Sequence, residues 1–180
     1  MNKILKLTVI LFLVCAIVAG VLGVVNELTF DRIQEQQRIK TERAYNAVLP
    51  AAGYEDVDFD KEADTTITKI SKATDGAGYV VTTTFSGSQS RITMAVGVDK
   101  DFKCSGISII SHGETSGLGA NAASTAEVGV SFRAQFVGQD ENIALSKNGG
   151  EIDALTGATI TSRSVTEATA RAIRAVQGLA

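Results

Sequence analysis

The chain has 180 residues, which is enough for one ordinary domain and one additional segment. Its formal net charge is −3, and because Lys3 and Lys6 are the only charged side chains before residue 26, the remainder holds 15 basic against 20 acidic side chains. Such an acidic remainder lacks the basic surface that nucleic acids require, so no nucleic-acid partner is expected. One His and two Cys also exclude a multi-histidine metal site and a disulfide framework.

An apolar run from Leu7 to Val25, interrupted only by Thr8, predicts a transmembrane helix. Its 19 residues would extend about 28 Å as a helix, close to the roughly 30 Å of a bilayer core. The run is longer than the apolar part of a signal peptide. Val14 stands before Cys15, where a lipoprotein would need a small residue, so we predict an uncleaved anchor.

The charges beside this run predict its orientation. Lys3 and Lys6 precede it, while Glu27 and Asp31 follow it. Because positive charges stay on the cytoplasmic side, residues 1–25 are predicted to form a cytoplasmic N-terminus and a single anchor in the inner (cell) membrane. The rest of the chain is then extracytoplasmic.

Residues 26–64 are predicted to form a helical stalk and a connector. The segment 26–48 is polar and rich in helix formers, and Pro50, the only proline, supplies a stop signal. We expect this helix to continue from the membrane span and to be more solvated than packed, because its apolar residues are sparse. These residues are Ile33, Tyr45 and Val48. Residues 50–64 look like an acidic connector.

Residues 65–180 are predicted to form an α+β domain. Four runs rich in β-branched residues predict an antiparallel meander, with strands at 65–71, 79–86, 92–99 and 102–111. A short helix is expected within 119–131 and a loop at 147–151. The fold class is thus a single N-terminal transmembrane helix followed by an antiparallel sheet packed with helices.

The clearest helix is predicted over 162–179. Its apolar residues share one face at i, i+3 and i+4 spacing, and they are Val165, Ala168, Ala172, Ile173, Val176 and Leu179. Ser164 and Glu167 resemble a capping box, although the first turn could also start at Thr161 or Ser162. Cys104 lies in a predicted strand and is interpreted as a small core residue.

A glycine-rich loop, His112 to Gly119, follows the last predicted strand. Its three glycines allow backbone N–H groups to approach a flat ligand, although a generic turn has the same composition. Gly117-x-Gly119-x-x-Ala122, with Asp140 downstream, also matches a loose dinucleotide fingerprint. The strand does not run directly into the first glycine of that match, so a dinucleotide site is not favoured.

Hydroxyl side chains gather between Asp153 and Arg163, directly before the strongest helix. A helix N-terminus presents unpaired N–H groups and favours a phosphate, to which Arg163 could add charge-assisted contacts. The alternative is that Thr161 or Ser162 merely caps the helix, and the two interpretations are compatible.

The two segments together resemble a known family. Thr156-Gly157-Ala158-Thr159 is similar to the attachment motif of covalent FMN-binding domains, which occur in the RnfG subunit of Rnf electron-transport complexes and in the NqrC subunit of the sodium-pumping NADH:quinone reductase. His112-Gly113-Glu114-Thr115-x-Gly117-Leu118-Gly119 resembles their second hallmark, with Ser116 where the NqrC-like loop usually has Pro. The resemblance covers residues 65–178 and the anchor, and the short chain is closer to RnfG.

The resemblance implies a covalent cofactor. The phosphate of FMN would be esterified to Thr159 by a flavin transferase that takes FMN from FAD and leaves AMP. Leu118 would pack against the ring, and loop N–H groups would stabilise the reduced flavin. Glu114 and His112 would either shape the loop or affect proton uptake. The full implied FMN site comprises Thr159, Leu155, Thr156, Gly157, Ala158, Thr161, Ser162, His112, Gly113, Glu114, Thr115, Gly117, Leu118 and Gly119.

The resemblance also implies a function. The chain would be an electron-carrying subunit, without independent catalysis, of an Rnf-type complex that couples electron transfer between ferredoxin and NAD to Na⁺ or H⁺ translocation. Its partners would be the A, B, C, D and E subunits, the flavin transferase and the lipid bilayer. Two alternatives are an NqrC-like or stand-alone extracytoplasmic flavoprotein and a flavin-free anchored binding module.

Overall fold

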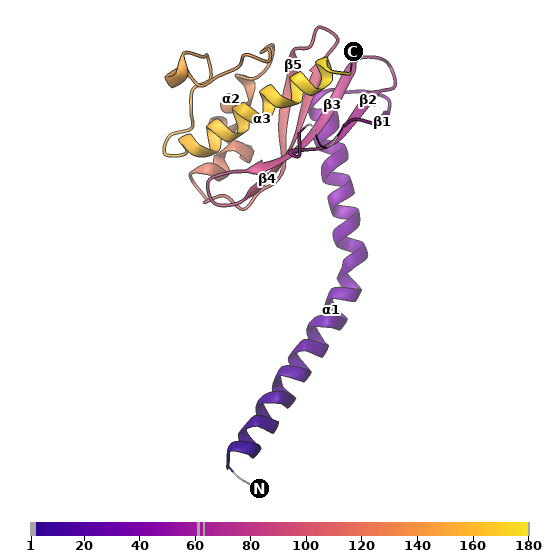
Figure 1. The fold of residues 1–180 in the computed structure, drawn as a ribbon, viewed down its shortest axis with the longest axis vertical. Helices are drawn as coiled ribbons and strands as arrows, with labels where there is room; N and C mark the ends of the chain where they lie inside the picture. Colours follow the sequence, from indigo (N-terminus) through magenta and orange to yellow (C-terminus); the bar gives the residue numbers. More distant parts are fainter. Residues whose placement is uncertain (1–2, 61, 63, 180) are drawn as a thin grey trace. The chain divides into compact units, whose positions relative to one another are not determined.

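The computed structural model describes residues 3–60, 62 and 64–179 of the chain (Figure 1). The backbone forms two compact units that divide between Lys40 and Thr41. The first unit is part of one long helix. The second contains the sheet, the remaining helices and the last turns of that long helix.

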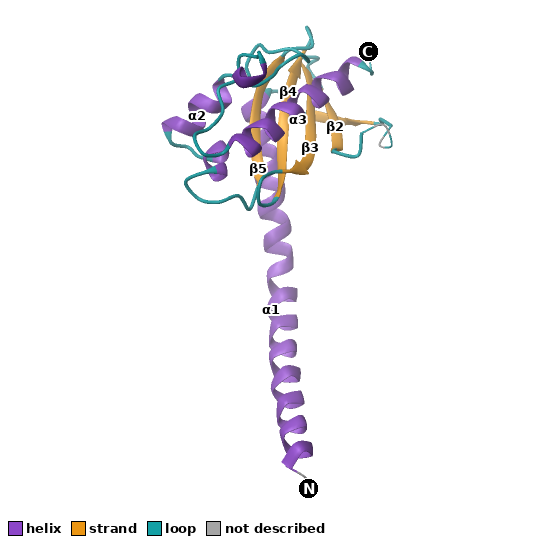
Figure 2. Cartoon of the chain, turned by 60° about the vertical axis from the view of Figure 1, so that its left-hand side comes forward, coloured by secondary structure: helices purple, strands orange, loops and turns teal. Residues whose placement is uncertain are grey.

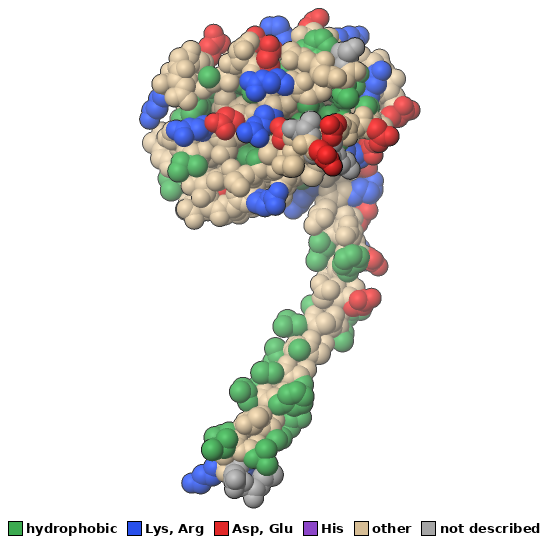
Figure 3. All heavy atoms as spheres, viewed as in Figure 1, with side chains coloured by type: hydrophobic (Ala, Val, Ile, Leu, Met, Phe, Trp, Pro, Cys, Tyr) green, Lys and Arg blue, Asp and Glu red, His purple; other side chains and the backbone are tan. Residues whose placement is uncertain are grey.

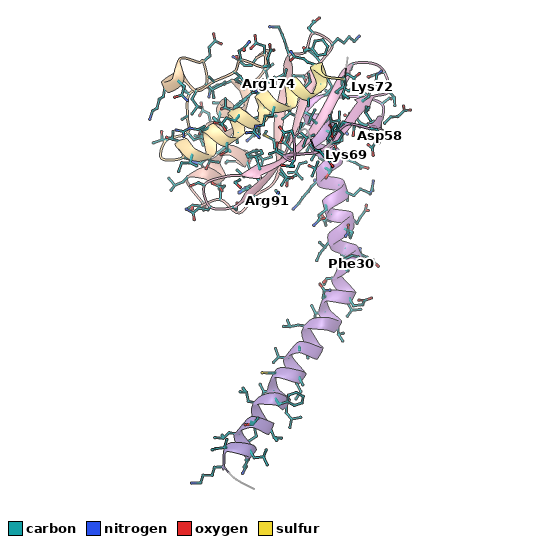
Figure 4. The ribbon with its side chains drawn as sticks, in the orientation of Figure 1. Phe30, Asp58, Lys69, Lys72, Arg91 and Arg174 are labelled. Atoms are coloured by element: carbon teal, nitrogen blue, oxygen red, sulfur yellow. The ribbon has the colours of Figure 1, made fainter. Side chains whose placement is uncertain are left out.

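Helix α1 runs over Lys3–Val48, so the predicted continuation of the apolar helix into the polar segment is confirmed. Its side chains are exposed from Lys3 to Arg38, and an 18-residue window within it has a mean hydropathy of 2.9. Figure 3 shows apolar side chains along this helix, and Phe30, labelled in Figure 4, is one of those exposed. By length and composition α1 is able to cross a membrane.

The last turns of α1 are packed, and here the expectation of a solvated helix is wrong. Tyr45 and Val48 are 5% and 2% exposed. The Tyr45 hydroxyl lies 2.7 Å from the Thr82 hydroxyl, and the Ser105 hydroxyl donates to the Val48 carbonyl at 2.6 Å. A Cβ at Gly97 would lie 2.6 Å from that carbonyl oxygen, so glycine allows the close approach of helix and strand. Only the end of α1 packs in this way, so a few apolar residues are enough to cover the contact.

The sheet is a five-stranded antiparallel meander in the order β1-β2-β3-β4-β5, so the predicted arrangement is confirmed (Figure 2). Its strands are β1 (Tyr54–Val57), β2 (Ile67–Ala73), β3 (Gly78–Ser86), β4 (Arg91–Asp99) and β5 (Cys104–Ser111). Because every neighbouring pair is antiparallel, the sheet contains none of the parallel crossovers on which a dinucleotide-binding fold depends.

Strand β1 lies inside the segment interpreted as an acidic connector, so that interpretation is corrected. It pairs with β2 at the edge of the sheet. Asp56 of β1 accepts a hydrogen bond from the Ser71 hydroxyl at 3.0 Å and forms an ion pair with Lys69 at 2.8 Å, and Lys69 is labelled in Figure 4. The sequence does not predict this strand, because its two central residues are acidic and exposed, so that apolar and polar residues do not alternate along it.

The remaining helices follow the sheet. They are the 3₁₀-helix η1 (Gly119–Ala123), α2 (Glu127–Ala134), the 3₁₀-helix η2 (Ser146–Asn148) and α3 (Thr159–Gln177). The single short helix expected within 119–131 is thus two, and the expected loop at 147–151 begins with a 3₁₀ turn that ends in the left-handed Gly149.

Helix α3 covers one face of the sheet (Figures 1 and 2). Its predicted buried face is confirmed, with Val165, Ala168, Ala172, Ile173 and Val176 buried and Leu179 partly buried. These side chains pack against the inward residues of the strands, among them Met94 and Val96. Cys104 is 1% exposed and belongs to this core, and burial raises the pKa of its thiol to about 12.

Candidate functional site

The two sequence motifs meet at the start of α3. The loop 112–119 leaves the end of β5, and residues 155–158 lead into Thr159. A Cβ built at Gly157 would lie 3.0 Å from the Cδ2 atom of Leu118, so the motifs are in contact. Gly157 has φ +73°, a left-handed conformation that turns the chain into the helix and that other residues rarely adopt.

The structure places the predicted site residues at two levels. Thr159 is half-buried. The exposed members are His112, Gly113, Thr115, Gly117, Leu118, Thr156 and Gly157. The buried members are Glu114, Gly119, Leu155, Ala158, Thr161 and Ser162. The residues of the first set are accessible to solvent, and those of the second set lie in the interior of the domain.

The hydroxyl groups of the first helical turn are not equivalent. The Thr161 hydroxyl donates to the Glu114 carboxylate at 2.7 Å. The Ser162 hydroxyl donates to the Ala158 carbonyl at 3.0 Å and accepts from the Leu155 N–H at 3.0 Å. Among the described residues the Thr159 hydroxyl has no hydrogen-bond partner. In this turn the Thr159 hydroxyl thus differs from those of Thr161 and Ser162, which are engaged in internal hydrogen bonds.

The N-terminus of α3 differs from the predicted one. The helix begins at Thr159, and its N-cap residue is Ala158, without a side-chain hydrogen bond. The expected capping box of Ser164 and Glu167 and the expected starts at Thr161 or Ser162 are therefore wrong. These residues lie inside the helix because the left-handed glycine before the N-cap begins it earlier. The first N–H groups of α3 are left without a side-chain acceptor, as an anion-binding helix start requires.

Glu114 is the most connected side chain of the site and is 8% exposed. Its Oε1 atom accepts from the N–H groups of Gln89 and Ser90 at 3.0 Å each, and from the Ser90 hydroxyl at 3.3 Å. Its Oε2 atom accepts from the Ser88 N–H at 3.2 Å and from the Thr161 hydroxyl at 2.7 Å. One carboxylate thus joins the β3–β4 turn, the glycine-rich loop and α3.

These donors also determine the charge of Glu114. Burial alone would raise the pKa of its carboxyl group, but the hydrogen bonds from Thr161, Gln89, Ser90 and Ser88 outweigh it and hold the pKa below its ordinary value. Glu114 is therefore an ionised carboxylate at neutral pH.

The rest of the loop is held by its own backbone contacts. The Gly113 N–H donates to the Ser90 hydroxyl at 2.8 Å, and the Glu114 N–H donates to Nδ1 of His112 at 3.3 Å. Further on, the Asn121 side chain donates to the Gly117 carbonyl at 2.9 Å. The glycine-rich loop is therefore tied to its surroundings at both ends.

The stretch from Gly87 to Gln89 is a turn signal in the sequence, but the contribution of Ser88, Gln89 and Ser90 to the site is not predicted from it. This turn contributes mainly backbone N–H groups, which every residue except proline carries, so no residue type marks it. The residue type that hints at a close approach here is Gly87, and in the structure a Cβ at this position would lie 2.5 Å from Oε1 of Glu114. Ile160, which follows Thr159 in the chain, was not predicted either, and its apolar side chain is 59% exposed.

Comparison with known families places both motifs in one domain. Residues 87–174 match a family model described as an FMN-binding domain, and residues 1–48 match one described as the RnfG N-terminal region. The first match includes the 88–90 turn, the loop 112–119 and the start of α3, so it contains all the segments that Glu114 joins.

Two relatives match over nearly their full lengths. The chain is 32% identical over 176 residues to the G subunit of the ion-translocating oxidoreductase complex of Methanosarcina acetivorans, covering 93% of this chain and 91% of the relative. It is 31% identical over 196 residues to the G subunit of the Na(+)-translocating ferredoxin:NAD(+) oxidoreductase complex of Acetobacterium woodii, covering 97% and 92%.

A solved structure has the same fold. It is the C subunit of the Na(+)-translocating NADH-quinone reductase from Parabacteroides distasonis, with a TM-score of 0.53 and 19% identity, covering 78% of this chain and 92% of that one. This structure shows a shared fold, whereas the relatives and the family models show the family. The chain belongs to the family of G subunits of ion-translocating oxidoreductase (Rnf) complexes, and it contains that family's FMN-binding domain.

Proposed function

We propose that the chain carries FMN as a phosphoester of the Thr159 hydroxyl and passes electrons through it as the G subunit of an Rnf-type complex. The observation that carries this proposal is the difference among three neighbouring hydroxyls. Thr161 and Ser162 are 0% exposed and use their hydroxyls in internal hydrogen bonds. Thr159 is half-buried, and among the described residues its hydroxyl has no such bond.

The surroundings of Thr159 fit a phosphate group. The helix start has no side-chain cap, so its N–H groups and the positive end of its dipole favour an anion. Gly157 leaves open the space that a Cβ would fill beside Leu118. Arg163 is exposed on the next turn and can add a charge-assisted contact to a phosphate.

The attachment reaction balances without an oxidant. The Thr159 oxygen attacks the phosphorus of the FMN half of FAD, the bond from that phosphorus to the bridging oxygen breaks, and AMP leaves with that oxygen. The hydroxyl proton goes to solvent or to a base of the transferase. Thr159 is the nucleophile, and the small residues before it, Gly157 and Ala158, leave its oxygen accessible to a second protein.

The exposed apolar side chains beside Thr159 fit a flat ring system. Leu118 is 44% exposed and lies against Gly157, two residues before Thr159, and Ile160, which follows Thr159 in the chain, is 59% exposed. When bound, the flavin supplies the electron transfer, and no acid–base or nucleophilic residue pair is required of the chain for that step. The role of this surface is to hold the ring near the protein.

As a G subunit, the chain works inside an assembly of several proteins. We propose that these partners are the A, B, C, D and E subunits of an Rnf-type complex, with a flavin transferase required for maturation. Helix α1 would anchor the chain in the bilayer of the cell (inner) membrane. Lys3 and Lys6 would keep its N-terminus cytoplasmic, so that the flavin domain is extracytoplasmic.

The attachment is tested by intact mass spectrometry of the full chain, co-expressed with a flavin transferase. The wild type is expected to gain the mass of FMN less one water, located to Thr159 by peptide mapping. Thr159→Ala is expected to lose this gain, and Thr159→Ser, which keeps a hydroxyl, to retain part of it. A wild type that folds but stays unmodified would refute the attachment and favour a flavin-free binding module.

The orientation is tested separately. Protease added from outside, after the outer layers are permeabilised, is expected to degrade the chain beyond residue 30. Protection of this part of the chain would reverse the proposed topology while leaving the flavin attachment intact. Isolation of the protein alone, never with integral-membrane or iron–sulfur subunits, would count against assembly in an Rnf-type complex.

A further inference from the structure

Glu114 has no hydrogen-bonding capacity left for a ligand. A carboxylate offers about four acceptor sites. Three N–H groups of the β3–β4 turn and the hydroxyls of Ser90 and Thr161 occupy them at 2.7 to 3.3 Å. A side chain that is 8% exposed and surrounded by protein donors is not available to a flavin ring.

Glycines make room for this carboxylate on two sides. A Cβ at Gly87 would lie 2.5 Å from Oε1 of Glu114, and a Cβ at Gly119 would lie 2.5 Å from Oε2. The Gly119 Cβ would also lie 2.7 Å from the Thr161 hydroxyl. The contact between Glu114 and Thr161 therefore requires glycine at the end of the loop. This explains why residue 119 of the glycine-rich loop is glycine.

The contact between Glu114 and Thr161 fixes the helical turn that contains Thr159. Thr161 is two residues beyond the attachment residue. On the other side, the Ser162 hydroxyl bonds to the backbone of Leu155 and Ala158, which lead into that turn. Hydrogen bonds of two adjacent buried hydroxyls, those of Thr161 and Ser162, thus hold the first turn of α3. The Thr159 hydroxyl takes part in none of these hydrogen bonds.

We propose that Glu114 is a positioning residue for flavin attachment, which holds Thr161 and the 88–90 turn on one carboxylate and thereby presents the Thr159 hydroxyl beside the glycine-rich loop. This inference rests on the proposed attachment at Thr159. Because protein donors occupy its oxygens, Glu114 would act without contacting the phosphate or the ring. Its acceptors are used by the Thr161 hydroxyl and by a distant turn, so the first N–H groups of α3 remain free for the phosphate.

The decisive variant is Thr161→Val, which keeps the shape of the side chain and removes the hydroxyl by which α3 reaches Glu114. Thr166→Val and Thr169→Val are matched controls on the same helix. Both residues are buried, and their hydroxyls donate to carbonyls one turn back, at 2.8 and 2.9 Å, instead of to Glu114. Thr161→Ser restores a hydroxyl and serves as the rescue.

The first measurement is the initial rate of FMN incorporation into the full chain, with purified flavin transferase and FAD. Thr161→Val is expected to reduce this rate roughly ten- to a hundredfold, because a misplaced nucleophile loses effective concentration. The two control variants are expected to stay within about twofold of the wild type, and Thr161→Ser is expected to recover most of the rate.

The second measurement uses the chain before it carries flavin. Hydrogen exchange of the backbone amides reports the contact itself, because the N–H groups of Ser88, Gln89 and Ser90 donate to Glu114. Glu114→Gln, which replaces one acceptor oxygen by a donor, is expected to speed exchange at these amides and in the first turn of α3. Thr169→Val is expected to leave them unchanged.

The outcomes separate the two proposals. If the wild type takes up no flavin at Thr159, the proposed attachment fails, and the role of Glu114 in it fails as well. If the wild type is modified and Thr161→Val reacts at the wild-type rate, the positioning role alone is refuted. Equal slowing of Thr161→Val and Thr166→Val, or failure of Thr161→Ser to recover the rate, would also refute it.

Discussion

Helices α1 and α3 are both long, but they distribute their apolar side chains in opposite ways. From Lys3 to Arg38 the side chains of α1 are exposed, including the whole apolar run. In α3 the apolar side chains form one stripe, with Val165, Ile173 and Val176 fully buried against the sheet. Apolar content alone therefore does not locate a core. An all-round distribution suits lipid, and a one-sided stripe suits a sheet face.

The acidic residues of the two regions differ in the same way. Glu35 on α1 is exposed and pairs with Arg38 at 2.8 Å. Glu114, which contacts Thr161 in the first turn of α3, is buried and accepts hydrogen bonds from backbone and hydroxyl groups. The hydrogen bond from Arg38 lowers the pKa of Glu35, and the several internal donors lower that of Glu114 despite its burial. Only the second carboxylate connects distant segments.

The largest effect is expected from a charge placed in the stripe of α3. Ile173→Asp would bury a carboxylate with no partner at a position that is 0% exposed, at a cost of several kcal/mol, which is comparable to the stability of a whole domain. The unit from Thr41 onward is expected to lose its cooperative thermal transition in circular dichroism. Glu167→Gln, at an exposed position of α3, is the control. A wild-type transition in Ile173→Asp would show that the stripe is not the core.

The same charge in α1 is expected to have a different consequence. Ile17→Asp is expected to make the free energy of membrane insertion about 3 kcal/mol less favourable, because a carboxylate is unfavourable at the centre of a bilayer. This lowers the equilibrium constant for insertion roughly a hundredfold. The unit from Thr41 onward should keep its thermal transition. The measurement is the fraction of protein that remains with membranes after alkaline extraction, with Ile17→Leu as the control. Full retention of Ile17→Asp would contradict the anchoring role of α1.

The smallest effect concerns acid stability. The pKa of Glu114 is lower in the folded chain than its ordinary value of 4.5, so its carboxylate stabilises the fold above that pH, and the stabilisation is lost as the pH falls through the folded value. Glu114→Gln should reduce the free energy of unfolding at neutral pH by about 1 to 3 kcal/mol, and the difference from the wild type should narrow in acid.

Denaturant titrations across the acid range measure this difference. Glu35→Gln is the matched control, because its exposed ion pair is screened by solvent and salt and should leave the pH dependence nearly unchanged. A constant difference between the wild type and Glu114→Gln at every pH would mean that the ionised form of Glu114 has no special role.

Patterns repeated along the chain were readable in advance. The β-branched runs predicted strands β2 to β5, and the i, i+3, i+4 spacing predicted the buried face of α3. The role of Glu114 was not readable, because its partners are backbone N–H groups some 25 residues away. Sequence reasoning left open whether Glu114 shapes the loop, and its geometry supports that alternative.

Irregular positions required the tertiary structure. Strand β1 depends on an edge pairing that no local pattern announces, and Tyr45 is buried only because the end of α1 reaches the sheet. The start of α3 was misplaced because the serine and threonine hydroxyls resemble caps. In the structure the Thr161 and Ser162 hydroxyls bond to Glu114 and to the segment before the helix instead.

The amino-acid sequence by itself determined the long apolar helix, the antiparallel sheet, the packed face of α3 and the two motifs of the FMN-binding domain. These follow from local composition and periodicity, which act over a few residues. Only the tertiary structure decided that, within the described part of the chain, the Thr159 hydroxyl has no hydrogen-bond partner while the hydroxyls of Thr161 and Ser162 are engaged. The reason is that a hydrogen bond between residues 47 positions apart depends on how the chain folds back on itself.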